Sequence, residues 1–154
     1  MATETTQPEQ LVHDYAAWLN GESSKVKVLS ESVDVYNPGL PDGEVHSRSD
    51  YQAYIQGLRT GLPDFQFTAD EVISSGDTVM VEFSITGTHD GELKGIPATG
   101  RKIEIRGIEK FRVADGKIQA MYAYFDTRQI PEQLGLTFPT VLSQLPKLAL
   151  KKIR

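Results

Sequence analysis

Long runs of alternating apolar and polar residues fill much of the second half of the chain, and they restrict it to half-buried strands. The first run has four apolar residues that share one face of a strand: Val79, Val81, Phe83 and Ile85. The run over residues 101–113 repeats the pattern. A period of two is that of a strand with one face on the core and the other in water, as in many antiparallel sheets. The second half therefore predicts an antiparallel meander.

Turn and helix signals organise the rest of the chain. Asp115-Gly116 is typical of a two-residue hairpin and predicts that residues 117–125 return as a further strand. In the first half, helices are predicted after a capping box that starts at Thr6, over about residues 24–30, and from Ser49 onwards. Helices followed by an antiparallel meander predict an α+β fold in which the helices pack on a curved sheet.

Length and composition are those of an ordinary globular protein. The 154 residues predict one domain, with a core at about residues 8–136 and a basic amphipathic tail at residues 137–154. The net charge of -5 argues against nucleic acid as a partner, because phosphate binding needs a basic face. The absence of cysteine excludes disulfides and thiolate chemistry. No signal peptide or bilayer-spanning stretch is found, so a cytoplasmic location is predicted.

The tail leaves two alternatives open. Residues 137–154 carry four cations and no acid among several aliphatic residues, so they could lie on a membrane surface. Pro139 and Pro146 interrupt the amphipathic pattern. A C-terminal helix that packs on its own domain or on a second subunit is therefore favoured.

Two polar residues fall on the apolar faces of the predicted strands. His89 continues the face that begins at Val79, provided the strand stays regular. The alternative is a histidine in a turn beside Asp90 that has no functional role. Glu109 is the charged residue on the apolar face of residues 103–113. Burial would raise the pKa of its carboxyl unless it is paired, and a salt bridge to a neighbouring Arg or Lys is the alternative.

The last predicted strand ends at a carboxylate. Asp126 follows Tyr122 and Tyr124 along one face, so these three residues would join the two candidates above. The alternatives are that Asp126 caps the next helix, with Gln129 completing an Asp-x-x-Gln box, and that the tyrosines line the core. Acids, an imidazole and phenols in an apolar concavity are typical of a small-molecule site.

Other kinds of site find no support in the sequence. Three scattered histidines without ligand spacing argue against zinc. The glycine-rich segments at residues 87–91 and 95–100 lack the Lys-Ser/Thr of a phosphate loop. No Gly-x-Ser-x-Gly elbow is found. Neither a metal nor an organic cofactor is expected.

A set of short motifs, in order and at consistent spacing over about residues 10–136, resembles the SnoaL-like polyketide cyclases of the NTF2-like superfamily. The motifs are Gly-Leu-Pro-Asp (61–64), Ser-Gly-Asp (75–77), Gly-Thr-His-x-Gly (87–91), Gly-Ile-Pro-x-Thr-Gly (95–100), Phe-Arg-Val-x-Asp-Gly-Lys-Ile (111–118), Phe-Asp (125–126) and Gln-Leu-Gly (133–135). The resemblance implies a cone of curved sheet and helices around a hydrophobic cavity.

The resemblance also implies a reaction and its residues. Cyclases of this family close a ring by intramolecular aldol condensation, without cofactor or metal, and use one carboxylate as general acid/base. Asp126 matches that carboxylate in position, and His89 is the second expected catalytic residue. The resemblance further implies a homodimer. The residues expected to bind the substrate are Tyr122, Tyr124, Glu109, Asn37, Tyr36 and Tyr54.

The chain departs from the family pattern at two places. Many relatives have Glu-His-Trp where this chain has Ala120-Met121-Tyr122, and many carry a histidine near Tyr36, where this chain has none. The superfamily includes isomerases, dehydratases, epoxide hydrolases and members that only bind ligands, so the fold alone does not name a reaction. The first hypothesis is a cofactor-free acid/base enzyme, an aldol-type cyclase, isomerase or lyase, acting on a hydrophobic carbonyl compound. The alternatives are a non-catalytic binding protein for an apolar molecule and a dimerisation module.

Overall fold

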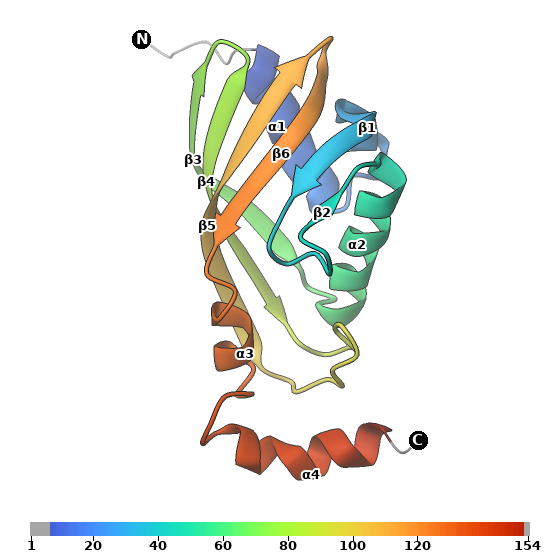
Figure 1. Ribbon diagram of the computed structural model, residues 1–154, viewed down its shortest axis with the longest axis vertical. Coiled ribbons are helices and arrows are strands. Elements are labelled where there is room, and N and C mark those ends of the chain that lie inside the picture. The colour runs from blue at the N-terminus through green and yellow to red at the C-terminus, as the bar shows by residue number, and fades with distance from the viewer. Residues whose placement is uncertain (1–6, 153–154) are drawn as a thin grey trace.

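The computed structural model describes residues 7–152, with side chains up to residue 149, and it has the predicted α+β architecture. Six strands form one curved, unclosed sheet (Figure 1). The strands are β1 (Leu29–Tyr36), β2 (Glu44–Val45), β3 (Gln66–Ser75), β4 (Thr78–Thr88), β5 (Lys102–Ala114) and β6 (Lys117–Phe125). The helices are α1 (Gln7–Leu19), the 3-10 helix η1 (Ser23–Val28), α2 (Arg48–Gly61), α3 (Gln129–Gln133) and α4 (Val141–Lys152).

The sheet is antiparallel at all but one of its strand pairs. Its order is β2-β1-β6-β5-β4-β3, and the parallel pair is β1 with β6. The long strands β3 to β6 form the predicted meander. Asp115 and Gly116 connect β5 to β6, with φ values of 55° and 70° as a type I′ turn requires.

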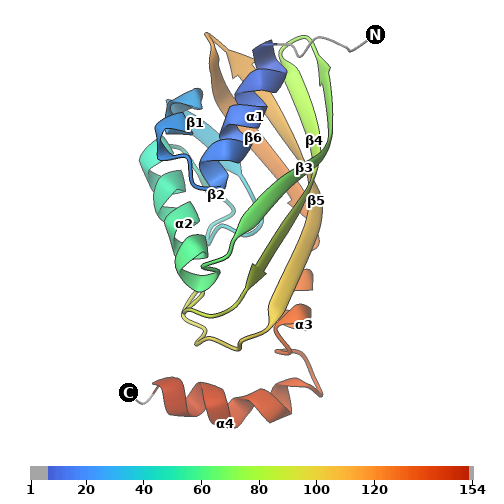
Figure 2. The same cartoon turned by 180° about the vertical axis from the view of Figure 1, so that it is seen from behind.

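Helices α1 and α2 cover one face of the sheet (Figures 1 and 2). The α1 residues Val12, Tyr15 and Trp18 are buried there with the predicted apolar face of β4, including Val79 and Val81. Because both helices bury an apolar stripe against the curved sheet, the core and any internal cavity lie between these two layers.

A β-bulge in β6 changes which side chains face inward. Val113 pairs with Ile118 and Phe111 pairs with Met121. Between these two pairs β6 therefore contains one residue more than β5. The extra residue shifts the phase, because successive strand residues point to opposite faces. After Ile118, the inward residues of β6 are therefore Met121 and Ala123, not Tyr122 and Tyr124.

Helix boundaries differ from the predictions in detail. Ser47, not Ser49, caps α2, since its side chain accepts a hydrogen bond of 3.2 Å from the Asp50 backbone amide. The capping residue predicted for the first helix, Thr6, lies outside the described residues. The predicted C-terminal helix is present as α4, at the end of the molecule opposite the start of α1 (Figures 1 and 2). Its residues Leu142 and Leu145 are 56% and 51% exposed.

Candidate functional site

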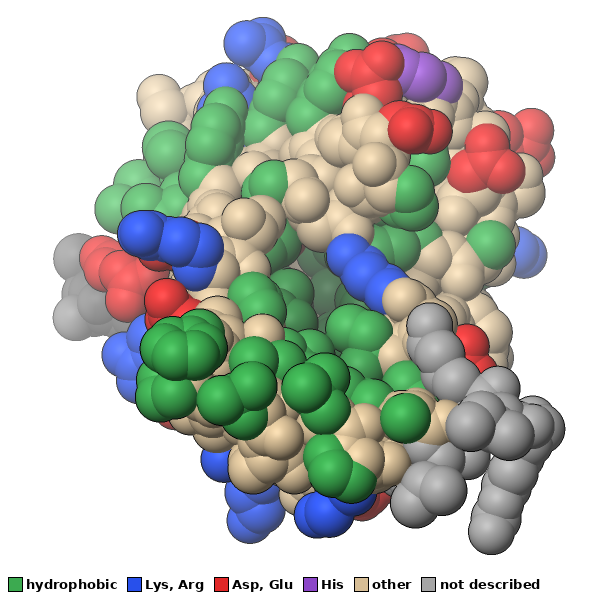
Figure 3. Space-filling view, turned by 60° about the horizontal axis from the view of Figure 1, so that its bottom comes forward, with side chains coloured by type: hydrophobic (Ala, Val, Ile, Leu, Met, Phe, Trp, Pro, Cys, Tyr) green, Lys and Arg blue, Asp and Glu red, His purple; other side chains and the backbone are tan. Residues whose placement is uncertain are grey.

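A cavity of about 260 Å³ lies between the helices and the sheet. Its walls are mostly aliphatic and aromatic, from α1, α2, the central strands and α3. Figure 3, which looks toward the lower end of Figure 1, shows a hollow lined by hydrophobic side chains with a cationic side chain at its rim. The volume is slightly below the roughly 300–1,000 Å³ typical of ligand pockets, so a large ligand would extend through the mouth.

Glu109 of β5 is the acid that lines this cavity. It is 4% exposed, and it faces inward because it pairs with Val81 and Ala123, both buried on the same face. Among the described residues no Lys or Arg lies within ion-pair distance of its carboxyl, so the predicted salt-bridge alternative is wrong. The alternation of apolar and polar residues in β5 predicted the inward position of Glu109 correctly.

Two buried tyrosines and the Glu109 carboxyl are linked by hydrogen bonds, and only Tyr15 contacts the carboxyl. The Tyr15 hydroxyl donates a hydrogen bond of 3.2 Å to Glu109 Oε1, and the Tyr51 hydroxyl lies 2.6 Å from that of Tyr15. A hydroxyl has one proton, so when Tyr15 donates to Glu109, Tyr51 must donate to Tyr15. The three groups form a directed chain from α2 through α1 to the sheet.

Burial determines the protonation of these groups. Desolvation raises the pKa of the Glu109 carboxyl to about 7, and the hydrogen bond from Tyr15 opposes that rise. Burial also raises the pKa of Tyr15 and Tyr51 well above the ordinary value, so both hydroxyls stay protonated donors. A carboxyl with a pKa near neutrality can both accept and donate a proton, which is what a general acid/base needs.

The mouth of the cavity carries a second group of polar residues. Asn37 Oδ1 accepts a hydrogen bond of 2.7 Å from the Gly39 amide, and both residues line the cavity. Tyr54 of α2 lines it as well, and desolvation raises the pKa of its hydroxyl to about 12. Lys94, from the segment between β4 and β5, donates a hydrogen bond to the Gly39 carbonyl. Of these residues, Asn37 and Tyr54 were predicted to bind substrate and Lys94 was not.

His89 is buried as predicted, but it is not among the residues that line the cavity. Its Nδ1 accepts a hydrogen bond of 3.3 Å from the Thr99 amide and lies 3.0 Å from Thr99 Oγ1. Backbone hydrogen bonds between His89 and the segment 100–101 close the same connection. The imidazole therefore fixes the segment that joins β4 to β5.

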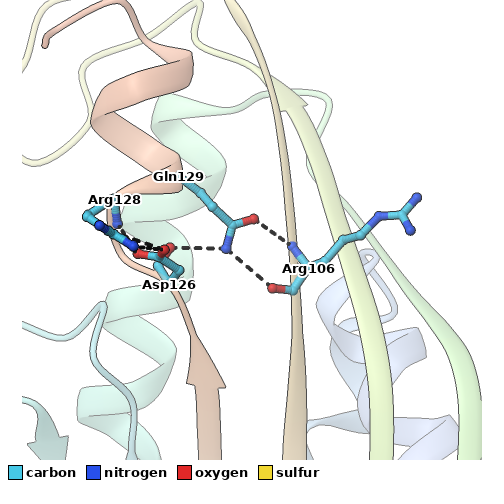
Figure 4. Close-up of polar contacts among 4 residues, drawn as sticks. All are labelled: Arg106, Asp126, Arg128 and Gln129. Carbon is cyan, nitrogen blue, oxygen red and sulfur yellow. Dashed lines mark hydrogen bonds and ion pairs between the residues drawn. The ribbon is translucent and has the colours of Figure 1, made fainter.

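Asp126 lies at the surface beyond the end of β6 (Figure 4). Its side chain is 47% exposed and forms an ion pair of 2.8 Å with Arg128. It also accepts a hydrogen bond of 3.0 Å from the Arg128 amide. The bonds from the Arg128 side chain and amide lower the pKa of the Asp126 carboxyl. The predicted inward position is wrong, because the bulge in β6 reverses the phase that placed it there.

The capping alternative for Asp126 is also wrong, because the N-cap of α3 is Arg128, two residues further on. Its carboxylate bonds the amide of Arg128, two residues on, and not that of Gln129. The Gln129 side chain bonds the Asp126 carbonyl at 3.0 Å and both backbone groups of Arg106 on β5 (Figure 4). Gln129 thus ties the start of α3 to the sheet.

The three remaining candidates do not line the cavity. Tyr122 stacks on Tyr36 with ring centroids 5.0 Å apart, and the Lys110 ammonium lies 4.5 Å from the centre of the Tyr122 ring. Tyr124 is 58% exposed. These side chains lie on the outer face because of the same bulge in β6, and because Tyr36 pairs with Tyr122 in the parallel ladder.

Two further structural findings concern metal ions and membranes. Among the residues that the structure describes, no three acids or histidines are grouped so that they could hold a metal ion. Within the same part of the chain, no helix has the length and hydropathy to cross a membrane.

The curved sheet, the helices on one face and the apolar cavity between them define the class of fold, and comparison with known proteins gives the family. The sequence profile of the SnoaL-like polyketide cyclases matches residues 10–134. The chain is 36% identical over 138 residues to the aklanonic acid methyl ester cyclase DnrD of Streptomyces peucetius, covering 77% of this chain and 95% of DnrD. The chain therefore belongs to the SnoaL-like polyketide cyclase family.

Solved structures agree with this assignment. IdmH of Streptomyces antibioticus, described as a polyketide cyclase, is 25% identical with a TM-score of 0.74, covering 84% of this chain and 99% of IdmH. AclR of Streptomyces galilaeus, described as a hydroxylase, is also 25% identical with a TM-score of 0.74, covering 87% of this chain and 99% of AclR. The predicted fold family is thereby confirmed.

Proposed function

We propose that this protein is a cofactor-free cyclase for a hydrophobic, polycyclic carbonyl compound, and that Glu109 is its general acid/base. The observation that carries the proposal is the buried Glu109 carboxyl inside the apolar cavity of a cyclase-family fold, where desolvation raises its pKa to about 7. A base is most effective when its pKa lies near the working pH, because both protonation states are then accessible.

The reaction balances with one carboxyl and no further reagent. Glu109 as the carboxylate takes the proton from the carbon next to a carbonyl, and an enolate forms. The enolate carbon bonds to a second carbonyl carbon of the same molecule, and the protonated Glu109 returns its proton to the new alkoxide. The Tyr54 hydroxyl, which stays protonated and lines the cavity, donates to the enolate oxygen. The apolar walls hold the two reacting carbons close together.

Asp126 is the second candidate for the acid/base role. It occupies the position of the family carboxylate, and its neighbours Phe125 and Thr127 both line the cavity. Its low pKa and its ion pair with Arg128 make it a weaker base than Glu109 near neutral pH. Glu109 is therefore preferred.

Turnover by two isosteric variants tests the assignment. Aklanonic acid methyl ester, the compound in the name of DnrD, is the first substrate to assay, with product formation followed by chromatography. Glu109→Gln is expected to lower kcat by about 10²–10⁴-fold, the usual contribution of general acid/base catalysis. Asp126→Asn is expected to retain activity within about threefold, because its carboxylate faces solvent.

The opposite result, full activity in Glu109→Gln and loss in Asp126→Asn, would assign the acid/base role to Asp126.

A non-catalytic binding protein is the alternative function, favoured by the outward position of Asp126, the residue that matches the family carboxylate. In that case polycyclic ketones bind the wild type and both variants equally, and no compound is converted.

The proposed setting is the cytoplasm, and the proposed assembly is a homodimer. Apolar side chains exposed on the outer sheet support self-association, since Met80 and Ile108 are each 42% exposed and Tyr124 is 58% exposed. Sedimentation velocity of wild type and Ile108→Lys tests the assembly. A dimer that dissociates in the variant is expected, and a wild-type monomer at micromolar concentration would contradict it.

A further inference from the structure

Lys94 occupies a tight turn at the mouth of the cavity. Leu93 and Ile96 exchange two backbone hydrogen bonds, of 3.0 and 2.8 Å, around Lys94 and Gly95. Lys94 has a φ of 50°, a left-handed conformation that residues other than Gly, Asn and Asp rarely adopt. The chain therefore holds a lysine where turn chemistry alone would favour another residue.

The ammonium of Lys94 is oriented by two neighbours and neutralised by none of the described residues. It donates to the Gly39 carbonyl and lies 5.9 Å from the centre of the Tyr54 ring. Partial desolvation lowers its pKa. No carboxylate lies within ion-pair distance of it in the part of the chain that the structure describes. One of its three donors is used by Gly39, so two are available to a ligand.

The cavity thus has two different polar ends. Glu109 accepts a hydrogen bond from the Tyr15 hydroxyl of α1 in the interior, whereas Lys94 lines the mouth, where its side chain is also exposed to solvent. Apolar side chains, including Phe83 and Ile105, line the rest of the cavity. A ligand that satisfies both ends has a neutral carbonyl at the interior end, an apolar ring body and an anionic group at the mouth.

We propose that Lys94 binds an anionic oxygen of the ligand, a carboxylate or an ionised phenol on a fused-ring body, and so selects acidic over neutral polycyclic ligands. The inference rests on the cavity binding proposed above and adds the charge of its ligand. It does not depend on turnover, because it concerns affinity alone. The contact with Gly39 holds the ammonium at the mouth, so little side-chain entropy is lost on binding.

Paired ligands that differ in charge and by one methyl group test the inference. The first pair is anthraquinone-2-carboxylate and its methyl ester, and the second is alizarin and its methyl ether at the acidic phenol. Dissociation constants are measured by fluorescence quenching at fixed low salt. The variants are Lys94→Met, which removes the charge, and Lys94→Arg, which keeps it; neither replacement is β-branched, so both tolerate the turn as Lys does. Lys110→Met, which removes a charge from the outer sheet face, is the matched control.

Wild type is expected to bind at least one acidic ligand about tenfold more tightly than its neutral partner. Lys94→Met should lose that preference while its affinity for the neutral partner changes less than threefold, and Lys94→Arg and Lys110→Met should keep it. Discrimination within the first pair alone identifies a carboxylate site, and within the second pair alone a phenolate site.

Equal affinity of wild type for both members of each pair, or a preference that survives Lys94→Met, overturns the inference and leaves the acid/base proposal intact. Loss of turnover in Glu109→Gln supports the acid/base proposal. An unchanged preference of that variant for the acidic ligands supports the Lys94 inference separately. No binding of any of the four ligands at millimolar concentration contradicts the inference and the cavity proposal together.

Discussion

The Tyr15 hydroxyl donates a hydrogen bond of 3.2 Å to Glu109 Oε1 across the interface between α1 and the sheet. The contact joins residues 94 positions apart in the chain, and it opposes the effect of burial on the carboxyl. Burial alone would favour the neutral acid more strongly, whereas a donated hydrogen bond favours the carboxylate. The balance leaves Glu109 with a pKa of about 7 and makes its protonation sensitive to small changes in its surroundings.

Glu109→Gln should make the protein more stable at high pH. The folded pKa of Glu109 is about 7 against an ordinary 4.5, so the native state holds a proton that the unfolded state releases. Stability then falls as pH rises from about 4.5 to 7 and stays low above that range. The difference corresponds to about 3 kcal/mol, which the uncharged Gln avoids.

Urea unfolding at pH 5 and pH 8 measures this effect. Wild type should lose about 3 kcal/mol between the two pH values relative to Glu109→Gln. Glu82→Gln, on the exposed face of β4, is the matched control and should follow wild type. Parallel pH dependence of wild type and Glu109→Gln would show that Glu109 is not desolvated.

Tyr15→Phe should move the pH profile of activity to higher pH. The substitution removes the donor that stabilises the Glu109 carboxylate, so the pKa of Glu109 rises further. One hydrogen bond to a charged group is worth about 1.5–3 kcal/mol, so a shift of about one to two pH units is expected.

The pH dependence of kcat/KM reports the free-enzyme pKa and checks this prediction. Tyr51→Phe is the control, since it contacts Tyr15 and not the carboxyl and should shift the profile less. A shift to lower pH in Tyr15→Phe would show that Tyr15 does not stabilise the carboxylate.

The sequence predicted the position of Glu109 because β5 stays regular against β4 along its whole length. The same method failed for Tyr122, Tyr124 and Asp126, since one extra residue in β6 reverses the face of everything after it. No glycine or proline lies at that bulge, so the sequence carries no signal that would predict it. Lys94 was missed for a different reason, because its place at the mouth depends on how a connecting segment folds back onto Gly39.

The hydrogen bond between the Tyr15 and Tyr51 hydroxyls could not be predicted from the sequence. Tyr15 and Tyr51 have helical spacing that predicts core residues, and they are core residues. Their hydroxyls meet only because α1 and α2 pack on the same face of the sheet. A side chain's packing role can be predicted from local periodicity, whereas a hydrogen bond between distant segments depends on the tertiary arrangement.

His89→Leu should destabilise the protein and loosen the segment that carries Lys94. The imidazole Nδ1 accepts from the partly buried Thr99 amide, and an amide left without a partner there costs up to about 1–3 kcal/mol, the range for a fully buried group. His89→Asn keeps an acceptor oxygen and should lose less stability than His89→Leu. Thermal unfolding compares the two, and hydrogen exchange of residues 90–100 reports on the segment. Equal stability of both variants would contradict a role for the Thr99 bond.

Gly39→Ala should disturb the mouth of the cavity for steric reasons. A Cβ at this position would lie 2.6 Å from the Tyr54 hydroxyl and 3.1 Å from Asn37 Oδ1, both closer than ordinary van der Waals contact. The Tyr54 hydroxyl and the side-chain amide of Asn37 must therefore shift, and both groups line the cavity. Overpacking of this kind costs about 1–3 kcal/mol, and affinity for polycyclic ligands should fall with it.

Gly57→Ala is the matched control for this effect. Gly57 lies in α2 with nothing within 4 Å of its added Cβ, so alanine there should stabilise the helix by up to about 1 kcal/mol. Thermal unfolding and anthraquinone affinity are measured on both variants. Opposite changes in stability, with affinity reduced only in Gly39→Ala, are expected if close packing around Tyr54 shapes the mouth. Unchanged affinity in Gly39→Ala would mean that Tyr54 and Asn37 do not contact the ligand.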